Sequence, residues 1–344
     1  MKKLAALLIA TMLFAGLAMP AAAQKNVTIG VSVPVLANPF WRAFADFAVE
    51  AGEALGARVI VVDANQNDAN QLNQIQGLIS QGVDGMVITP NSSAIARSLL
   101  RQADRAGIPV VIAERYPGFS PDEYSGSSYV GFVGVDNTLA GYNIAKALYE
   151  AGARKIVANG GVPGGAVADE RHAGLKKFLD EHPDMILLQE LRNAELREHG
   201  LANAENFLSA FPGPAFEGIW NYNDDVALGS MQALRNAGVL SKVGVGGMDL
   251  IPEAVAAIEK GEMLFSTGGQ WAESAMAVVM VYDAIHGKAP THPVLELALP
   301  NVTKENVDAY KAQFIESTPE YDFRALSQVY NPHAKNTDFS IEMK

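Results

Sequence analysis

The sequence predicts an α/β protein of two similar lobes, each a doubly wound parallel sheet, joined by a multi-strand hinge. Short β-branched apolar runs alternate with segments of helical apolar spacing. The strands recur about every 25 to 30 residues, which is typical of βαβ units with right-handed crossovers. A loop rich in proline, glycine and serine at 116–128 interrupts this rhythm, which starts again after Val135. Two α/β halves therefore meet near that residue.

The first βα unit spans residues 27–55. The run 27–33 has strand length, and from Phe40 onward the apolar residues follow a helical spacing. Asn38, Phe40 and Trp41 thus lie at the carboxyl end of a strand, where open α/β sheets bind ligands. An amide beside two aromatic rings suits a neutral polar ligand with an apolar face, such as a sugar. The simpler interpretation, equally open for each ring, is that it only caps the core.

The other elements follow in chain order. Further strands are expected at 58–63, 85–90, 108–113, 129–135, 155–158, 185–189, 218–221, 243–247, 263–267 and 293–299. Further helices are expected around 72–79, from 91–93, after 136–138, over 167–179, near 199–209, from 224, and over 252–260, 271–286 and 304–314. The late strand 293–299 can recross the boundary, which predicts lobes of 25–135 with about 270–297, and of 136–269 with about 298–344.

The first 23 residues have the features of a cleavable secretory signal peptide. Two lysines precede a largely apolar run at 4–19, and the segment PAAA at 20–23 predicts cleavage after Ala23. The expected mature chain of about 320 residues suits two domains. We therefore expect an exported, soluble protein.

Composition disfavours several functional classes. The net charge is −12 and no basic run occurs, so nucleic acid is not an expected partner. The chain has no cysteine, and its six histidines are scattered without an HExxH pair. We expect neither a metal site nor a cofactor.

The candidate functional residues share one placement, in the loop or first helical turn after a predicted strand. They are Asn38, Phe40, Trp41, Thr89, Glu114, Arg115, Arg171, Asn221, Asn223, Asp249 and Gln270. Carboxylates, guanidinium groups and amides offer paired donors and acceptors that match the vicinal hydroxyls of a sugar. Taken singly, Asn223 can be a helix cap, the arginines can be solvated and Asp249 can be a turn residue. Their shared placement in both halves favours a binding site.

Two other patterns are weaker. The glycine loop at 160–165 follows a strand as a dinucleotide-binding loop would, but it lacks the G-x-G-x-x-G spacing. Glu114 and Asp249 could form an acid/base pair, but nearby arginines would keep both ionised. A flexible loop and a binding role are the better interpretations.

Several motifs resemble the periplasmic sugar-binding proteins of ABC transporters, in the ribose-binding cluster of the type I periplasmic binding protein family. The resemblance covers roughly residues 27–299. Its motifs are Ala37-Asn38-Pro39-Phe40-Trp41, Val87-Ile88-Thr89-Pro90, Ile108-Pro109-Val110-Val111, Val133-Gly134-Val135-Asp136-Asn137, Asn223-Asp224-Asp225-Val226-Ala227-Leu228-Gly229 and Gly246-Gly247-Met248-Asp249. The tail beyond about 301 extends past the family's usual end.

The resemblance implies roles in the first half of the chain. Asn38 would hydrogen-bond ligand hydroxyls, while Phe40 and Trp41 would sandwich the sugar ring. Glu114 and Arg115 take the place of the family's usual Asp-Arg pair, with a carboxylate one methylene longer.

The resemblance also implies roles in the second half. Arg171 is similar to the family's second binding arginine, and Asn223, Asp249 and Gln270 would complete a polar cage. Two positions depart from the pattern. Thr89 stands where asparagine is common, and Glu195 falls near a usually aromatic contact, so ribose is not assumed as the ligand.

The expected function is that of the solute-binding component of an ABC importer. Glu114 with Arg115, and Asp249 with Arg171, nearly cancel in charge, which favours a neutral monosaccharide or sugar alcohol. We expect a monomer whose lobes close on the ligand and which partners a membrane permease. A sensor role with a chemoreceptor stays open. A secreted carbohydrate-active enzyme would need a paired catalytic group, and none presents itself; a repressor would need a helix-turn-helix where the signal peptide stands.

Overall fold

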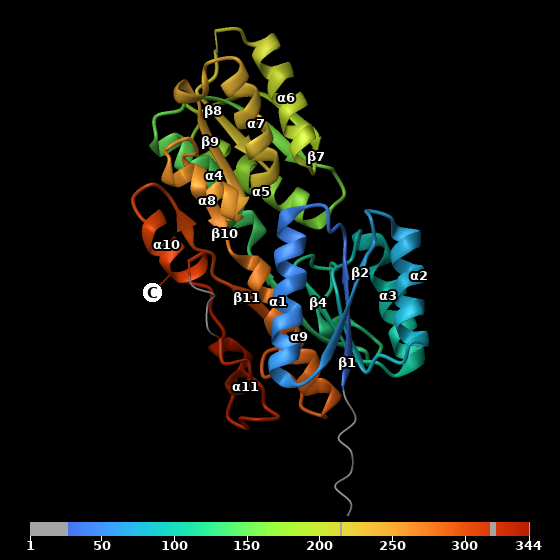
Figure 1. Ribbon diagram of the computed structural model, residues 1–344. Helices are drawn as coiled ribbons and strands as arrows, with labels where there is room; N and C mark the ends of the chain where they lie inside the picture. The colour runs from blue at the N-terminus through green and yellow to red at the C-terminus, as the bar shows by residue number, and fades with distance from the viewer. Residues whose placement is uncertain (1–26, 214, 317–320, 344) are drawn as a thin grey trace, which may run out of the picture.

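The protein consists of two lobes stacked end to end, each built on its own six-stranded sheet (Figure 1). The computed structural model describes residues 27–213, 215–316 and 321–343. The predicted signal peptide lies outside these residues. No helix within the described ranges is both long and apolar enough to cross a membrane.

The N-terminal lobe has the strand order β11-β5-β4-β3-β1-β2, and all its neighbouring strands are parallel. The strands are β1 (Thr28–Val33), β2 (Arg58–Asp63), β3 (Gly85–Ile88), β4 (Val110–Ala113), β5 (Tyr129–Val135) and β11 (Val294–Leu297). The helices are α1 (Pro39–Leu55), α2 (Asp68–Ser80), α3 (Ser93–Ala106) and α9 (Glu273–Ile285). Helices α1 and α9 pack together on one face of the sheet, and α2 and α3 cover the other.

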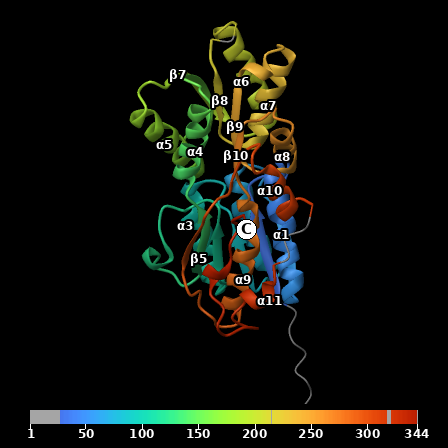
Figure 2. The ribbon, with the colours of Figure 1, turned by 90° about the vertical axis from the view of Figure 1, so that its left-hand side faces the viewer.

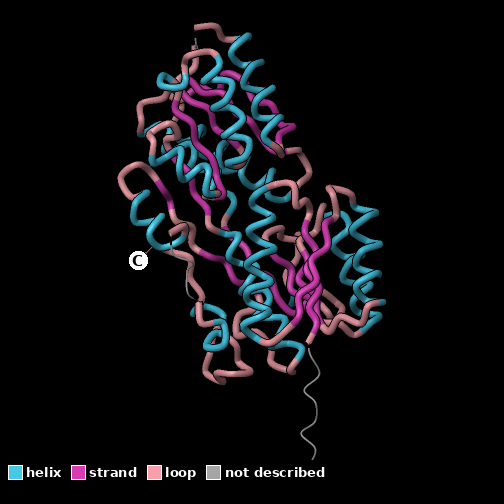
Figure 3. Tube along the Cα trace, in the orientation of Figure 1, coloured by secondary structure: helices cyan, strands magenta, loops and turns pink. Residues whose placement is uncertain are grey.

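The C-terminal lobe repeats this plan with the order β12-β10-β9-β8-β6-β7, in which only β12 runs antiparallel. The strands are β6 (Lys155–Gly161), β7 (Ile186–Ala194), β8 (Gly218–Asn221), β9 (Gly244–Asp249), β10 (Phe265–Gly268) and β12 (Asn301–Val302). The helices are α4 (Asn137–Glu150), α5 (Ala166–Glu181), α6 (Arg197–Ala210), α7 (Asp224–Asn236) and α8 (Pro252–Glu259). Figure 3 shows the strands of each lobe as one layer between helices.

Side chains alternate across the second sheet, as a strand period of two requires. The indole nitrogen of Trp220 donates to the carbonyl of Gly141 on α4, at 2.9 Å. The next residue, Asn221, instead accepts from Ser230 on α7, at 2.7 Å. Helices α4 and α5 therefore cover one face, and α6 and α7 cover the other.

Within the described residues, three connections run between the two sheets. They follow β5, β10 and β11, and the last leads into β12 on the other sheet. The predicted two-lobed α/β fold is confirmed. We propose lobe boundaries near residues 135, 270 and 298, where these crossings occur.

The C-terminal tail departs from its predicted place in the second lobe. Helix α10 (Val307–Phe314) does pack on α8, but α11 (Phe323–Leu326) returns to the first lobe, beside α1 and α9 (Figure 2). The rings of Tyr321 and Phe323 contact Phe47 at centroid distances of 5.8 and 5.6 Å. A few aromatic residues thus attach the tail, and its mainly polar composition concealed them.

Candidate functional site

The carboxyl ends of the strands of both sheets meet between the lobes, around one small cavity. Nine of the twelve predicted residues line it, together with Val167 and Tyr222. The nine are Asn38, Phe40, Trp41, Glu114, Arg115, Arg171, Glu195, Asn223 and Asp249. About 20 Å³ of space remains there, enough for about one water molecule. The lobes are thus closed over the predicted site.

A larger cavity of about 320 Å³ adjoins this closed site. It also lies between the lobes and shares Arg115, Val167, Glu195 and Tyr222 with the smaller one. Strand β6 extends to Gly161 and so includes the first residues of the predicted glycine-rich loop. The rest of that loop lines the larger cavity from the second lobe. This volume falls in the range of small-molecule pockets.

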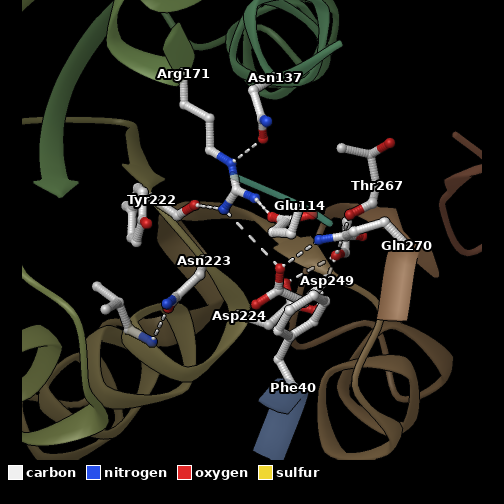
Figure 4. A network of polar contacts seen from close by, with 12 residues as sticks. Phe40, Glu114, Asn137, Arg171, Tyr222, Asn223, Asp224, Asp249, Thr267 and Gln270 are labelled. Atoms are coloured by element: carbon white, nitrogen blue, oxygen red, sulfur yellow. Dashed lines mark hydrogen bonds and ion pairs between the residues drawn. The ribbon is translucent and has the colours of Figure 1, made fainter. Parts of the chain in front are cut away.

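Arg171 is the centre of the polar network (Figure 4). Its Nε donates to Oδ1 of Asn137 at 2.9 Å, and its Nη1 donates to the carbonyl of Tyr222 at 2.9 Å. Its Nη2 lies 3.4 Å from Oε1 of Glu114 in the other lobe, and its Nη1 lies 3.9 Å from Oδ1 of Asp249. Only 2% of the residue is exposed. One buried guanidinium therefore joins a carboxylate from each lobe.

Close packing of α4 against α5 positions Arg171. A Cβ atom on Gly141 would lie 2.0 Å from the carbonyl oxygen of Arg171, and one on Gly174 would lie 1.9 Å from that of Thr138. Only glycine permits this approach of the two backbones. The helix pair therefore sets how far Arg171 reaches into the cleft.

The carboxylates stand on strained backbone at the ends of β4 and β9. Glu114 has φ +61° and Asp249 has φ +128°, both unusual for residues with side chains. Such conformations cost about 1–3 kcal/mol each and concentrate at functional sites. Gly268 permits the second, since a Cβ there would lie 2.4 Å from the Asp249 backbone. The Nε2 of Gln270 donates to Oδ1 of Asp249 at 2.9 Å and fixes its orientation.

Burial favours the protonated form of three carboxyl groups in or behind the site, against the expectation that nearby arginines keep Asp249 ionised. It raises the pKa of Asp249 well above its usual range, against the opposing effect of Arg171. It also raises the pKa of Asp224, which lies behind Asp249, to about 7, and raises the pKa of Glu195. Three carboxyl groups and two guanidinium groups line the cavity. A proton on one carboxyl brings the cavity close to neutrality.

Arg115 does not pair with Glu114 as predicted. Its Nη1 donates to the carbonyl of Asn91 at 2.6 Å, and its guanidinium lies 5.5 Å from the centre of the Trp41 ring. Arg171 takes its place beside Glu114 because α5 brings it across the cleft. The charge balance that the sequence indicates is therefore reached with different partners.

The aromatic residues do not form the expected sandwich. The rings of Phe40 and Trp41 lie edge to face, 4.8 Å apart and at 84°. Only one of them can lie parallel to a ligand ring, because both come from the start of α1. The aromatic side chain on the opposite lobe is Tyr222, whose ring lies 5.0 Å from the Arg171 guanidinium.

The two asparagines at the cavity also cap helices. Oδ1 of Asn38 accepts from the backbone nitrogen of Phe40, and Oδ1 of Asn223 accepts from that of Val226. Nδ2 of Asn223 donates to the carbonyl of Glu195. Each asparagine therefore caps a helix and also lines the cavity, because a helix cap at the carboxyl end of a strand faces the cleft.

Three predicted residues do not line the cavity. Asn221 faces α7, so its side-chain amide forms hydrogen bonds inside the second lobe. It donates to the carbonyls of Ile219 and Gly246 and accepts from Ser230. Thr89 directly follows β3 and is fully buried. Gln270 reaches the site only through Asp249.

Sequence analysis missed several residues of the site. Tyr222 and Val167 line the cavity, Asn137 holds Arg171, and Glu273 is buried beside Glu114. Tyr222 and Asn137 follow β8 and β5 closely, so the placement rule that selected their neighbours would have found them. Glu273 also satisfies the rule, in the first turn of the helix expected at 271–286, but its contact with Glu114 cannot be seen in the sequence. Among the described residues, no group of three or more potential ligand side chains could hold a metal ion.

Comparisons with known proteins identify the family and the fold. The family model of the periplasmic binding protein domain matches residues 29–289. The chain is 31% identical over 267 residues to the ribose import binding protein of Escherichia coli (strain K12), covering 76% of this chain and 85% of that protein. It is 29% identical over 283 residues to a xylitol-binding protein of Mycolicibacterium smegmatis, covering 81% and 78%.

Solved structures show the same architecture. An ABC transporter periplasmic solute binding protein from Actinobacillus succinogenes 130z, with bound D-allose, superposes with a TM-score of 0.75 at 26% identity. The match covers 83% of this chain and all of that one (100%). With two lobes, a site between them and a family match over most of its length, the chain belongs to the periplasmic binding protein domain family.

Proposed function

We propose that this protein binds a neutral monosaccharide or sugar alcohol between its lobes for an ABC importer. The observation that carries the proposal is the Arg171 network, which joins Glu114 of one lobe to Asp249 of the other. Such groups bind vicinal hydroxyls through charge-assisted hydrogen bonds. The cavity's near balance of charge favours a ligand without net charge. The ribose, xylitol and D-allose in the names of similar proteins support this class.

Hinge closure is part of the proposal. The closed site offers about 20 Å³, so a monosaccharide enters only when the lobes move apart. A ligand that contacts both lobes binds the closed arrangement preferentially and shifts its population. Small-angle scattering should show a smaller radius of gyration with saturating ligand, and an unchanged radius would contradict closure.

The proposal extends to the location and the partner of the protein. We propose that the segment 1–23 directs export and that the mature protein works as a periplasmic monomer, passing its ligand to a membrane permease. The names of similar proteins include the words import and periplasmic, which supports this proposal. We propose a binding role without catalysis, which predicts that a bound sugar is recovered chemically unchanged.

Calorimetric titration against a panel of pentoses, hexoses and polyols tests the proposed function. We expect at least one of them to bind with micromolar or tighter affinity, which corresponds to about 8 kcal/mol. Amino acids and sugar acids serve as comparison ligands. Binding of those compounds alone would overturn the proposal. Mass spectrometry of the released sugar tests the absence of turnover.

A further inference from the structure

Glu273 is a buried carboxyl group directly behind the ligand site. It is the first residue of α9, is 0% exposed, and neither of its oxygens has a hydrogen-bond donor among the described residues. Oε2 of Glu114 is likewise buried without a donor. The two carboxyl groups lie within hydrogen-bond reach of each other. Three acceptor oxygens thus meet in one water-excluded place.

A single proton shared by the two carboxyl groups would supply the missing hydrogen-bond donor. Two carboxylates in contact repel each other, whereas a neutral carboxylic acid donates an O–H to its neighbour. If Glu273 carries the proton, it donates to Oε2 of Glu114. Oε1 of Glu114 then stays with Arg171, as observed at 3.4 Å. The result is a chain from Glu273 through Glu114 to Arg171 and the cavity.

The charged groups around the pair favour one shared proton. Arg171 on α5 is the cation that acts on both carboxyl groups, and it is also engaged with Asp249 at the end of β9. Glu170 on α5 and Asp249 both interact unfavourably with the charge on Glu114. Asp224 adds a further carboxyl group beside Asp249. Acidic groups thus outnumber the guanidinium on the elements packed around the pair.

We propose that Glu273 is a positioning residue that stays protonated and holds Glu114 in place for the ligand. The inference rests on the proposed function, since it assigns the ligand-binding geometry of Glu114 to a side chain that never contacts ligand. Burial and the adjacent Glu114 raise the pKa of Glu273 well above its usual range, consistent with a neutral acid at physiological pH. A leucine of similar volume could fill the space but would leave Oε2 of Glu114 without a donor.

The proposal has a pH consequence of defined sign. The protonated form of Glu273 is the one that holds Glu114, so affinity is full below the raised pKa. As pH rises through that pKa, a second carboxylate forms beside Glu114 and repels it. Affinity for a neutral sugar should therefore fall on the alkaline side.

The test compares Glu273→Gln, Glu273→Leu and the control Glu53→Gln, an exposed position on α1. The amide of Gln donates to Glu114 as the neutral acid does but cannot titrate. We expect Glu273→Gln to bind the best sugar within about threefold of wild type, and Glu273→Leu to lose roughly 10- to 100-fold. The alkaline loss of affinity should persist in full in Glu53→Gln and become smaller in Glu273→Gln, in which Asp249 and Glu195 still titrate. Equal losses in the Gln and Leu variants, or an unchanged pH profile in Glu273→Gln, would overturn the proposal.

Infrared spectroscopy separates this proposal from the proposed function. A protonated carboxyl has a C=O stretch at higher wavenumber than a carboxylate, and Glu273→Gln should lose one such band at neutral pH without any sugar present. If no sugar binds wild type, the proposed function fails while the band still reports on Glu273. If Glu273→Gln does not fold, the wild-type band is followed with pH. Affinity that stays constant while the band disappears would then overturn the positioning role.

Discussion

Replacing Arg171 with alanine should abolish or severely weaken ligand binding. The change removes a guanidinium that reaches carboxylates from both lobes and leaves Glu114 and Asp249 without this cation. Removing one partner of a buried, hydrogen-bonded charge pair costs about 2–5 kcal/mol in binding, or roughly 30-fold to several thousandfold in affinity. Arg171→Lys keeps the charge but not the fork of donors, so it should lose about tenfold or more.

Calorimetric titration with the best sugar of the panel measures both variants. Arg235→Ala is the matched control, because it removes an arginine from an exposed ion pair with Glu262 on the same lobe. Such surface pairs contribute about 0–1 kcal/mol to stability, and this one lies away from the cleft. Affinity within about threefold of wild type in a folded Arg171→Ala variant would refute the assignment of Arg171 as the centre of the site.

Three further predictions concern the frame around the site. Gly141→Ala should separate α4 from α5 and reduce both melting temperature and sugar affinity, whereas Gly77→Ala, with open space around its position on α2, should raise stability by about 0.5–1 kcal/mol in thermal unfolding. Because the pKa of Asp224 is raised from 3.8 to about 7, its contribution to stability is full below the lower value and is lost as pH rises through the higher one. Denaturant titrations between these pH values should therefore show a flatter decline in Asp224→Asn, and an unchanged slope would contradict this. Phe323→Ala should lower the free energy of unfolding by about 3 kcal/mol without changing sugar affinity, and lost affinity would instead link the tail to the site.

The fold could be predicted because it follows from local patterns. The strand 27–33 and the helix after Phe40 are specified by apolar spacing, and each later βα unit repeats that signal. The tail could not be placed, since its contacts come from isolated residues such as Tyr321 and Phe323 with no periodicity. Their docking surface, around Phe47, exists only after α1 and α9 pack together.

The site was predicted in outline by one rule, that residues following parallel strands meet at one edge. The rule brought Asn38 and Asp249 to the same cavity although they lie far apart in the chain. It could not distinguish which side of the chain a residue faces, so it included Asn221, which points into the second lobe. Glu273 also satisfied the rule but was not selected, because its importance depends on a contact between α9 and the end of β4 that the sequence does not show.

A crystal structure of the protein with its best sugar tests the central claim most directly. We expect the sugar between the lobes, with hydroxyl oxygens in hydrogen-bond contact with Arg171 and Asp249 and a ring face against Phe40 or Trp41. A sugar bound outside the cleft, or one held by a single lobe without contact to Arg171, would contradict the account.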